Sequence, residues 1–169
     1  MSTIDEAPAP ELPWERFWQL IDLIGGAPAV AVCATFDDGC ERLTAALAAG
    51  PVEEIVGFGE RFAEALYGLD REEYGTQRAV DPDDPEEEPL PLSDDGFLYA
   101  RAAVVAAGRA AYEQVRADPA LFAAHSFRSG ESLLYAHEEA YETATGEEWE
   151  HVTRYDFESC SNREGWPNL

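Results

Sequence analysis

Ser93-Asp94-Asp95-Gly96-Phe97 opens a run of small residues that continues without a proline to Ala117. Ser93 is a favourable N-cap residue, and two aspartates in the first turn suit the positive end of a helix dipole. The run predicts one helix over residues 94–117, a rod of roughly 36 Å. Because small side chains on nearly every side let other helices approach closely, we expect this rod to be the buried centre of the fold.

Four other segments carry helix signals. Residues 13–24, 51–69 and 131–145 have apolar side chains at helical spacing, and Asp38 with Glu41 forms a capping-box pattern for a helix that ends at Gly50. Residues 27–36 fit either a short buried strand or a helical turn, and Asp118-Pro119 predicts a further short turn. The expected fold is therefore mainly all-α, a compact bundle of about five helices around the long central one.

Composition divides the chain into three parts. Residues 1–12 are predicted to be a flexible tail, and 13–146 a single helical domain interrupted by an acidic, proline-rich loop at 79–92. Within and just after that loop, residues 81–95 hold eight acidic side chains, four prolines and no basic residue, so charge repulsion and proline both oppose compact structure. Residues 147–169 alternate in polarity and are expected to form an extended segment or edge strand packed on the domain.

Charge is the extreme feature of the composition. The chain has 35 acidic residues against 11 arginines and no lysine, which gives a net charge of −24. Such a field repels nucleic-acid phosphates and anionic membranes, and it attracts basic proteins, polyamines or metal cations. The alternative explanation is that the charge serves only to keep the protein soluble.

Location and redox state are predicted from what the chain contains. Three cysteines, Cys33, Cys40 and Cys160, form no close pair and fit a reduced cytoplasm better than a disulfide scaffold. The N-terminus has neither the basic nor the apolar region of a signal peptide, and no apolar run is long enough to span a membrane. We expect a cytoplasmic protein.

Several short motifs together resemble a bacterial family. They are Phe17-Trp18-Gln19-Leu20-Ile21, Ser93-Asp94-Asp95-Gly96-Phe97, Gly108-Arg109, Asp118-Pro119, Ala140-Tyr141 and Thr145-Gly146. Their combination over roughly residues 14–146 resembles domain-of-unknown-function family 4240. This resemblance implies a mainly helical fold and implies no activity.

Four residues could carry chemistry in a small enzyme with an acidic cleft, namely Asp94, Asp95, Arg101 and His137. Helix capping explains the two aspartates without any further function. His137 begins a motif similar to a zinc-protease helix, but Tyr141 stands where the second histidine ligand is needed. We therefore predict no metal and no cofactor, and we expect His137 to be a partly buried structural histidine.

The last predicted helix carries a feature that structure alone explains poorly. Glu131, Tyr135, Glu138 and Glu142 share one face, and residues 131–150 contain no arginine. Like charges four residues apart destabilise a helix by ~0.2–0.5 kcal/mol per pair, a cost that a cationic partner can offset. We prefer a non-enzymatic interaction module that binds a basic protein, as an inhibitor or immunity-type protein would. A merely solvated face is the alternative.

Overall fold

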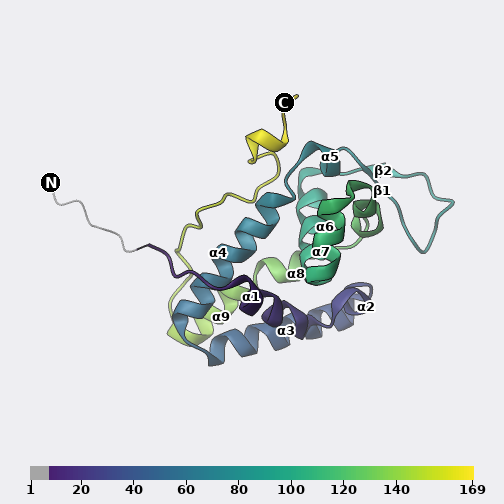
Figure 1. Ribbon diagram of the computed structural model, residues 1–169. Coiled ribbons are helices and arrows are strands. Elements are labelled where there is room, and N and C mark those ends of the chain that lie inside the picture. The colour runs from purple at the N-terminus through teal and green to yellow at the C-terminus, as the bar shows by residue number, and fades with distance from the viewer. Residues whose placement is uncertain (1–7) are drawn as a thin grey trace.

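The computed structural model describes residues 8–169 (Figure 1). Helices account for 62% of these residues, and the mainly α prediction is confirmed. The α-helices are α1 (Trp14–Ile21), α2 (Gly26–Val30), α3 (Cys33–Ala49), α4 (Val52–Gly68), α5 (Glu72–Gly75), α6 (Asp94–Ala106), α7 (Arg109–Ala117), α8 (Glu131–Leu134) and α9 (Ala136–Thr145). Three 3-10 turns, η1 (Asp22–Ile24), η2 (Pro119–His125) and η3 (Arg163–Gly165), and two short strands, β1 (Arg78–Ala79) and β2 (Leu90–Pro91), complete the described chain.

Helix α6 lies at the centre of the core. Its residues from Ala100 to Ala106 are all buried. Gly130, just before α8, donates its backbone N–H to the carbonyl of Tyr99 at 2.9 Å. A side chain at position 130 would collide with the backbone of Ala102 and Ala103, so this approach needs glycine on one side and small residues on the other.

The predicted single helix over residues 94–117 is wrong, because the chain breaks at Gly108 into α6 and α7. Gly108 has a φ of 105°, a conformation that costs glycine little and other residues much. Helix α7 turns one face inward through Tyr112 and Val115 and leaves the rest exposed. The described residues thus hold nine α-helices instead of about five, several of them a single turn.

In the N-terminal third, residues 27–36 follow the helical alternative of the prediction. Residues 27–30 belong to α2, Ala31 and Val32 form a turn, and residues 33–36 are the first turn of α3. Asp38 lies inside α3, so the predicted capping box is wrong. Val30 in α2 and Phe36 in the first turn of α3 are buried in the core, and their packing stabilises helix in this region. The helix over residues 13–24 is confirmed as α1 with η1, and the one at 51–69 is confirmed as α4. The predicted helix at 131–145 is interrupted at Tyr135 and forms α8 and α9.

The acidic loop is closed by a small hairpin. Strands β1 and β2 pair antiparallel, with Arg78 opposite Pro91 and Ala79 opposite Leu90. Residues 82–90 between them are exposed, and Figure 1 shows this loop projecting away from the helices. The acidic side chains of this loop are therefore exposed to solvent, and the pairing of β1 with β2 holds the two ends of the loop together.

The C-terminal segment, residues 147–169, runs along α4 towards the top of Figure 1. Burial alternates along residues 151–158, with the odd-numbered positions half-buried and the even-numbered ones exposed, although no strand forms in this stretch. The segment is held by buried side chains of the helices instead. The Glu60 carboxylate accepts from His151 Nε2 at 2.7 Å, and Arg101 Nη2 donates to the carbonyl of Phe157 at 2.8 Å.

The predicted N-terminal tail, residues 1–12, is described only from residue 8. Leu12 is buried, and its carbonyl accepts a hydrogen bond from Arg61 Nε at 2.6 Å. Residues 1–7 lie outside the described part of the chain.

Candidate functional site

The side chains predicted to bind a partner lie on the outer side of α8 and α9. Glu131, Tyr135 and Glu142 are exposed and Glu138 is half-buried. Opposite them, Leu133, Leu134, Ala136, His137 and Ala140 face the core. The apolar spacing of this helical stretch therefore turns the four predicted residues outward.

Repulsion acts among these carboxylates. Burial raises the pKa of Glu138, and the neighbouring charges of Glu142 and Glu139 raise it further. Across residues 8–169, no arginine lies within ion-pair distance of Glu131, Glu138 or Glu142. These three carboxylates therefore have no cationic side chain as a partner in the described chain.

Helix α6 extends this surface through Tyr99. Burial raises the pKa of Tyr99, and the charges of Glu131 and Asp95 add to the rise together with Tyr135. Since Glu131 and Asp95 both act on the same phenol, the start of α6 and the start of α8 are neighbours. We call the surface formed by these groups the acidic face; its members are Asp95, Tyr99, Glu131, Tyr135, Glu138 and Glu142.

Asp94 and Asp95, two of the four residues predicted for an acidic cleft, lie exposed in the first turn of α6. Ser93 caps this turn, because its Oγ accepts the backbone N–H of Gly96 at 3.0 Å. The capping interpretation of the Ser-Asp-Asp-Gly-Phe motif therefore matches the local geometry.

Arg101 is wholly buried. Its Nη1 donates to the carbonyl of Leu66 at 2.9 Å, and its guanidinium lies over the ring of Phe97 at 4.6 Å. Burial lowers the pKa of Arg101 to about 10, against the opposing effect of the Asp70 charge. Its Nη2 donates to the carbonyl of Phe157 and to Ser159 Oγ, while its Nε has no hydrogen-bond partner within residues 8–169. Arg101 thus joins α4 to the C-terminal segment, which is a structural use of an arginine.

His137 is 2% exposed and is surrounded by aromatic rings. The rings of Phe58, Phe62 and Trp149 lie at centroid distances of 6.4, 6.1 and 4.9 Å. Burial lowers the pKa of His137 to about 4, and the charge of His151 contributes. Its Nδ1 has no hydrogen-bond partner within residues 8–169.

These four residues do not share a cleft. The three main pockets of the described chain include His137 in one, and Asp94, Asp95 and Arg101 in none. In the same part of the chain, no group of three or more His, Cys, Asp or Glu side chains is placed to hold a metal ion. No described helix is both long and apolar enough to cross a membrane.

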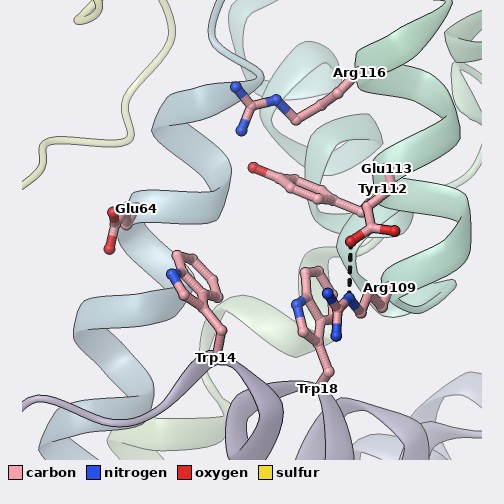
Figure 2. Close-up of a pocket in the computed structure, with 7 residues that line it drawn as sticks. All are labelled: Trp14, Trp18, Glu64, Arg109, Tyr112, Glu113 and Arg116. Atoms are coloured by element: carbon pink, nitrogen blue, oxygen red, sulfur yellow. Dashed lines mark hydrogen bonds and ion pairs between the residues drawn. The ribbon is translucent and has the colours of Figure 1, made fainter.

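A pocket of about 540 Å³ opens between α1, α4 and α7 (Figure 2). Its lining residues are Trp14, Trp18, Glu64, Arg109, Tyr112, Glu113 and Arg116. Trp14 and Trp18 rise from α1 with their rings inclined by 22° at 6.3 Å, and the Tyr112 ring lies 5.3 Å from Trp18. In Figure 2, Arg116 extends from α7 above Tyr112, and Arg109 pairs with Glu113 at 2.8 Å.

Sequence reasoning did not find this pocket. The aromatic stripe of the first helix predicts core residues, and Trp18, 7% exposed, meets that prediction, whereas Trp14 is only half-buried. The other walls come from α7, about a hundred residues later in the chain. The sequence of α7 does contain a signal for this wall of the pocket, because Arg109, Glu113 and Arg116 recur at helical spacing and so share one polar face.

Residues 8–169 thus form a mainly helical structure with an acidic face that has no arginine partner and with the aromatic-lined pocket of Figure 2. Comparison with protein families matches residues 13–143 to the family described as "Protein of unknown function (DUF4240)", and the chain belongs to that family. The family resemblance of the sequence motifs is thereby confirmed. Searches of curated proteins and of solved structures found no match.

Proposed function

We propose that this protein is a non-enzymatic interaction module that binds a basic protein through its acidic face. The proposal rests mainly on the absence of ion pairs between the carboxylates of this face and the arginines of the described chain. Ion pairs among residues 8–169 involve Glu11, Glu54, Glu60, Glu64, Glu73 and Glu113, all outside the acidic face.

An unbalanced cluster of this kind costs stability. Glu138 and Glu142 are one helical turn apart, a spacing at which like charges destabilise a helix by ~0.2–0.5 kcal/mol. A bound cationic surface attracts both carboxylates and so offsets their mutual repulsion. The opposite charges also speed the encounter of the two proteins by electrostatic steering. The repulsion that disfavours nucleic-acid phosphate supports a protein as the partner.

The acidic loop supports the same proposal. The start of α6 carries Asp95 into the acidic face, and the exposed loop at 82–90 leads into that helix. Loop and face together would present negative charge to one basic surface. The role of an inhibitor or immunity-type protein is consistent with such a surface, because it can cover a basic binding site.

The alternative is a small enzyme that uses Asp94, Asp95, Arg101 and His137. It receives less support, because Arg101 and His137 are buried in different surroundings and the two aspartates are exposed. A shared pocket would be needed for joint chemistry.

The test is a pull-down from native lysate at about 0.1 M and 1 M salt, where Debye lengths are ~10 Å and ~3 Å. One variant carries Glu131→Gln, Glu138→Gln and Glu142→Gln. Its matched control carries Glu41→Gln, Glu53→Gln and Glu164→Gln, three exposed acids on other elements that make no ion pair in the described structure. Both variants lose the same charge.

We expect a partner that the wild type and the control recover at low salt and that the acidic-face variant loses. Equal recovery by the two variants would show that only net charge matters. If the partner is recovered equally at both salt concentrations and by all three proteins, the interface lies elsewhere and the proposal is wrong.

A further inference from the structure

The aromatic pocket of Figure 2 has a fixed shape. Tyr112 donates its hydroxyl to the carbonyl of Ala65 at 2.9 Å, which holds its ring between α7 and α4. Trp18 is almost wholly buried, and Trp14 stacks beside it. Three aromatic side chains thus form a preorganised wall, and a pocket of about 540 Å³ lies within the range usual for small-molecule sites.

The carboxylates of the pocket already have cationic partners. Glu113 pairs with Arg109 at 2.8 Å, and Glu64 pairs with Arg61 at 2.9 Å. Arg116 is different, because within residues 8–169 no carboxylate lies at ion-pair distance from it. Its guanidinium interacts with Tyr112 instead, so the pocket presents one positive charge that has no carboxylate partner and carries donors suited to one.

The position of Arg116 is defined by its surroundings. Its Cζ lies 5.8 Å from the centroid of the Tyr112 ring. A Cβ added to Gly68 would lie 2.9 Å from the Tyr112 hydroxyl, so glycine is needed there for the tyrosine, and it would be in ordinary contact with Arg116 Nη1 at 3.5 Å, which places the guanidinium beside α4. The charge is thereby held at the edge of the aromatic wall.

A cationic ligand fits this pocket poorly, although aromatic cages often bind cations. Arg61 lies over Trp14 at 4.8 Å, and Arg116 lies over Tyr112. The protein's own guanidinium groups thus occupy two of the ring faces, and they would repel a further positive charge.

We propose that this pocket binds a small molecule that carries one aromatic ring and one carboxylate. The ring would pack on Trp14 and Trp18, and the carboxylate would pair with Arg116. This site lies on α1, α4 and α7, whereas the acidic face lies on α6, α8 and α9, so the inference does not depend on the proposed function.

Three probes that share a phenyl ring and carry a negative, a neutral and a positive group test the inference: phenylacetate, phenylacetamide and 2-phenylethylammonium. Each is titrated into the full ¹⁵N-labelled chain at about 0.15 M salt while the four tryptophan indole N–H signals are followed. We expect phenylacetate to shift the signals of Trp14 and Trp18 and to leave Trp149 and Trp166 unmoved. We also expect it to bind about tenfold tighter than the amide, with the ammonium probe weakest.

Tighter binding of the ammonium probe than of phenylacetate would overturn the inference, and so would shifts shared equally by all four indoles. Arg116→Gln should lower the affinity for phenylacetate to that of the amide. Arg163→Gln is the matched control, because Arg163 is also exposed and lacks an ion pair in the described chain but lies outside the pocket. An equal loss in both variants would remove Arg116 from the site and contradict the proposal.

Discussion

Asp70 and Trp166 are joined by a hydrogen bond of 2.8 Å from the indole Nε1 to Oδ1 of a fully buried carboxylate. The same oxygen accepts the backbone N–H of Cys160 at 2.9 Å, and Oδ2 accepts that of Asn162 at 2.9 Å. A carboxylate only accepts hydrogen bonds, so three N–H donors satisfy it without a cation. Asp70 is therefore the main polar anchor for the last ten residues of the chain.

Replacement of this anchor should loosen the C-terminal segment. In Asp70→Asn, one acceptor oxygen becomes an amide that faces N–H donors, and at least one buried donor loses its partner. We expect a loss of about 3 kcal/mol in the free energy of unfolding, measured by urea denaturation. Glu72→Gln is the control, because the side-chain carboxylate of Glu72 accepts a bond only from the exposed Asn168 in the described chain, and its replacement should change stability by less than about 0.5 kcal/mol. Equal losses in the two variants would contradict this role.

Sequence alone predicts those parts of the fold in which local signals agree with tertiary packing. The stripe of α4 places its apolar residues inward as predicted, and Gly146, with a φ of 72°, ends α9 where expected. The run of small residues predicts a helix that continues through Gly108, yet α6 ends just before this residue and α7 begins just after it. Whether a glycine continues a helix or breaks it depends on what packs beside it, and that is not a local property.

The buried charged residues also could not be predicted from local sequence. Glu60, Asp70 and Arg101 carry charges that periodicity assigns to solvent, yet each is buried. Their partners lie in the C-terminal segment, 91 residues away in the case of Glu60 and His151. Sequence can group Glu131, Tyr135, Glu138 and Glu142 because they are close in the chain, whereas Asp95 and Tyr99 join them only in the fold. The aromatic pocket joins α1 to α7 and was not predicted for the same reason.

Acid should destabilise the protein through His137. The pKa of this buried histidine is lowered to about 4, against about 6.5 for an unfolded chain. Between these values the unfolded state binds a proton that the folded state does not, so the stabilising effect is complete above about pH 6.5 and is lost as pH falls towards 4. At pH 5 we expect a cost of about 2 kcal/mol relative to pH 7.5.

The measurement is the free energy of urea unfolding at both pH values for the wild type and for His137→Phe. Phenylalanine keeps an aromatic ring among Phe58, Phe62 and Trp149 but cannot titrate. Comparison of the two proteins cancels the pH dependence of groups that do not interact with His137, including His125. The same change with pH in both proteins would rule out His137 as the source.

Loss of the Ser93 cap should weaken α6 at its first turn. The Ser93 hydroxyl accepts the N–H of Gly96, and Ser93→Ala leaves that donor to solvent. We expect a loss of about 1 kcal/mol, with most of it restored in Ser93→Asn, because asparagine caps as well as serine. Thermal and urea unfolding followed by circular dichroism measure both variants. A loss in Ser93→Asn as large as in Ser93→Ala would mean that capping is not what the motif provides.

Tyr135 should act as the apolar anchor of the acidic face. Its side chain is 47% exposed at the junction of α8 and α9, and its phenol contributes to the raised pKa of Tyr99. Exposed tyrosines surrounded by charge often dominate binding energy, because the ring buries much area with little loss of conformational freedom. We expect Tyr135→Ala to weaken a captured partner at least tenfold while stability changes by less than about 0.5 kcal/mol.

Phe127→Ala provides the control, since Phe127 is similarly exposed, at 49%, and lies outside the acidic face. The two kinds of contact should also differ in kinetics when binding is followed by biolayer interferometry. Substitution of Glu131 or Glu142 should slow association in a salt-dependent way, whereas Tyr135→Ala should speed dissociation at every salt concentration. If Tyr135→Ala and Phe127→Ala weaken the partner equally, or if Tyr135→Ala changes only the salt-dependent association rate, Tyr135 is not an anchor and charge alone holds the partner.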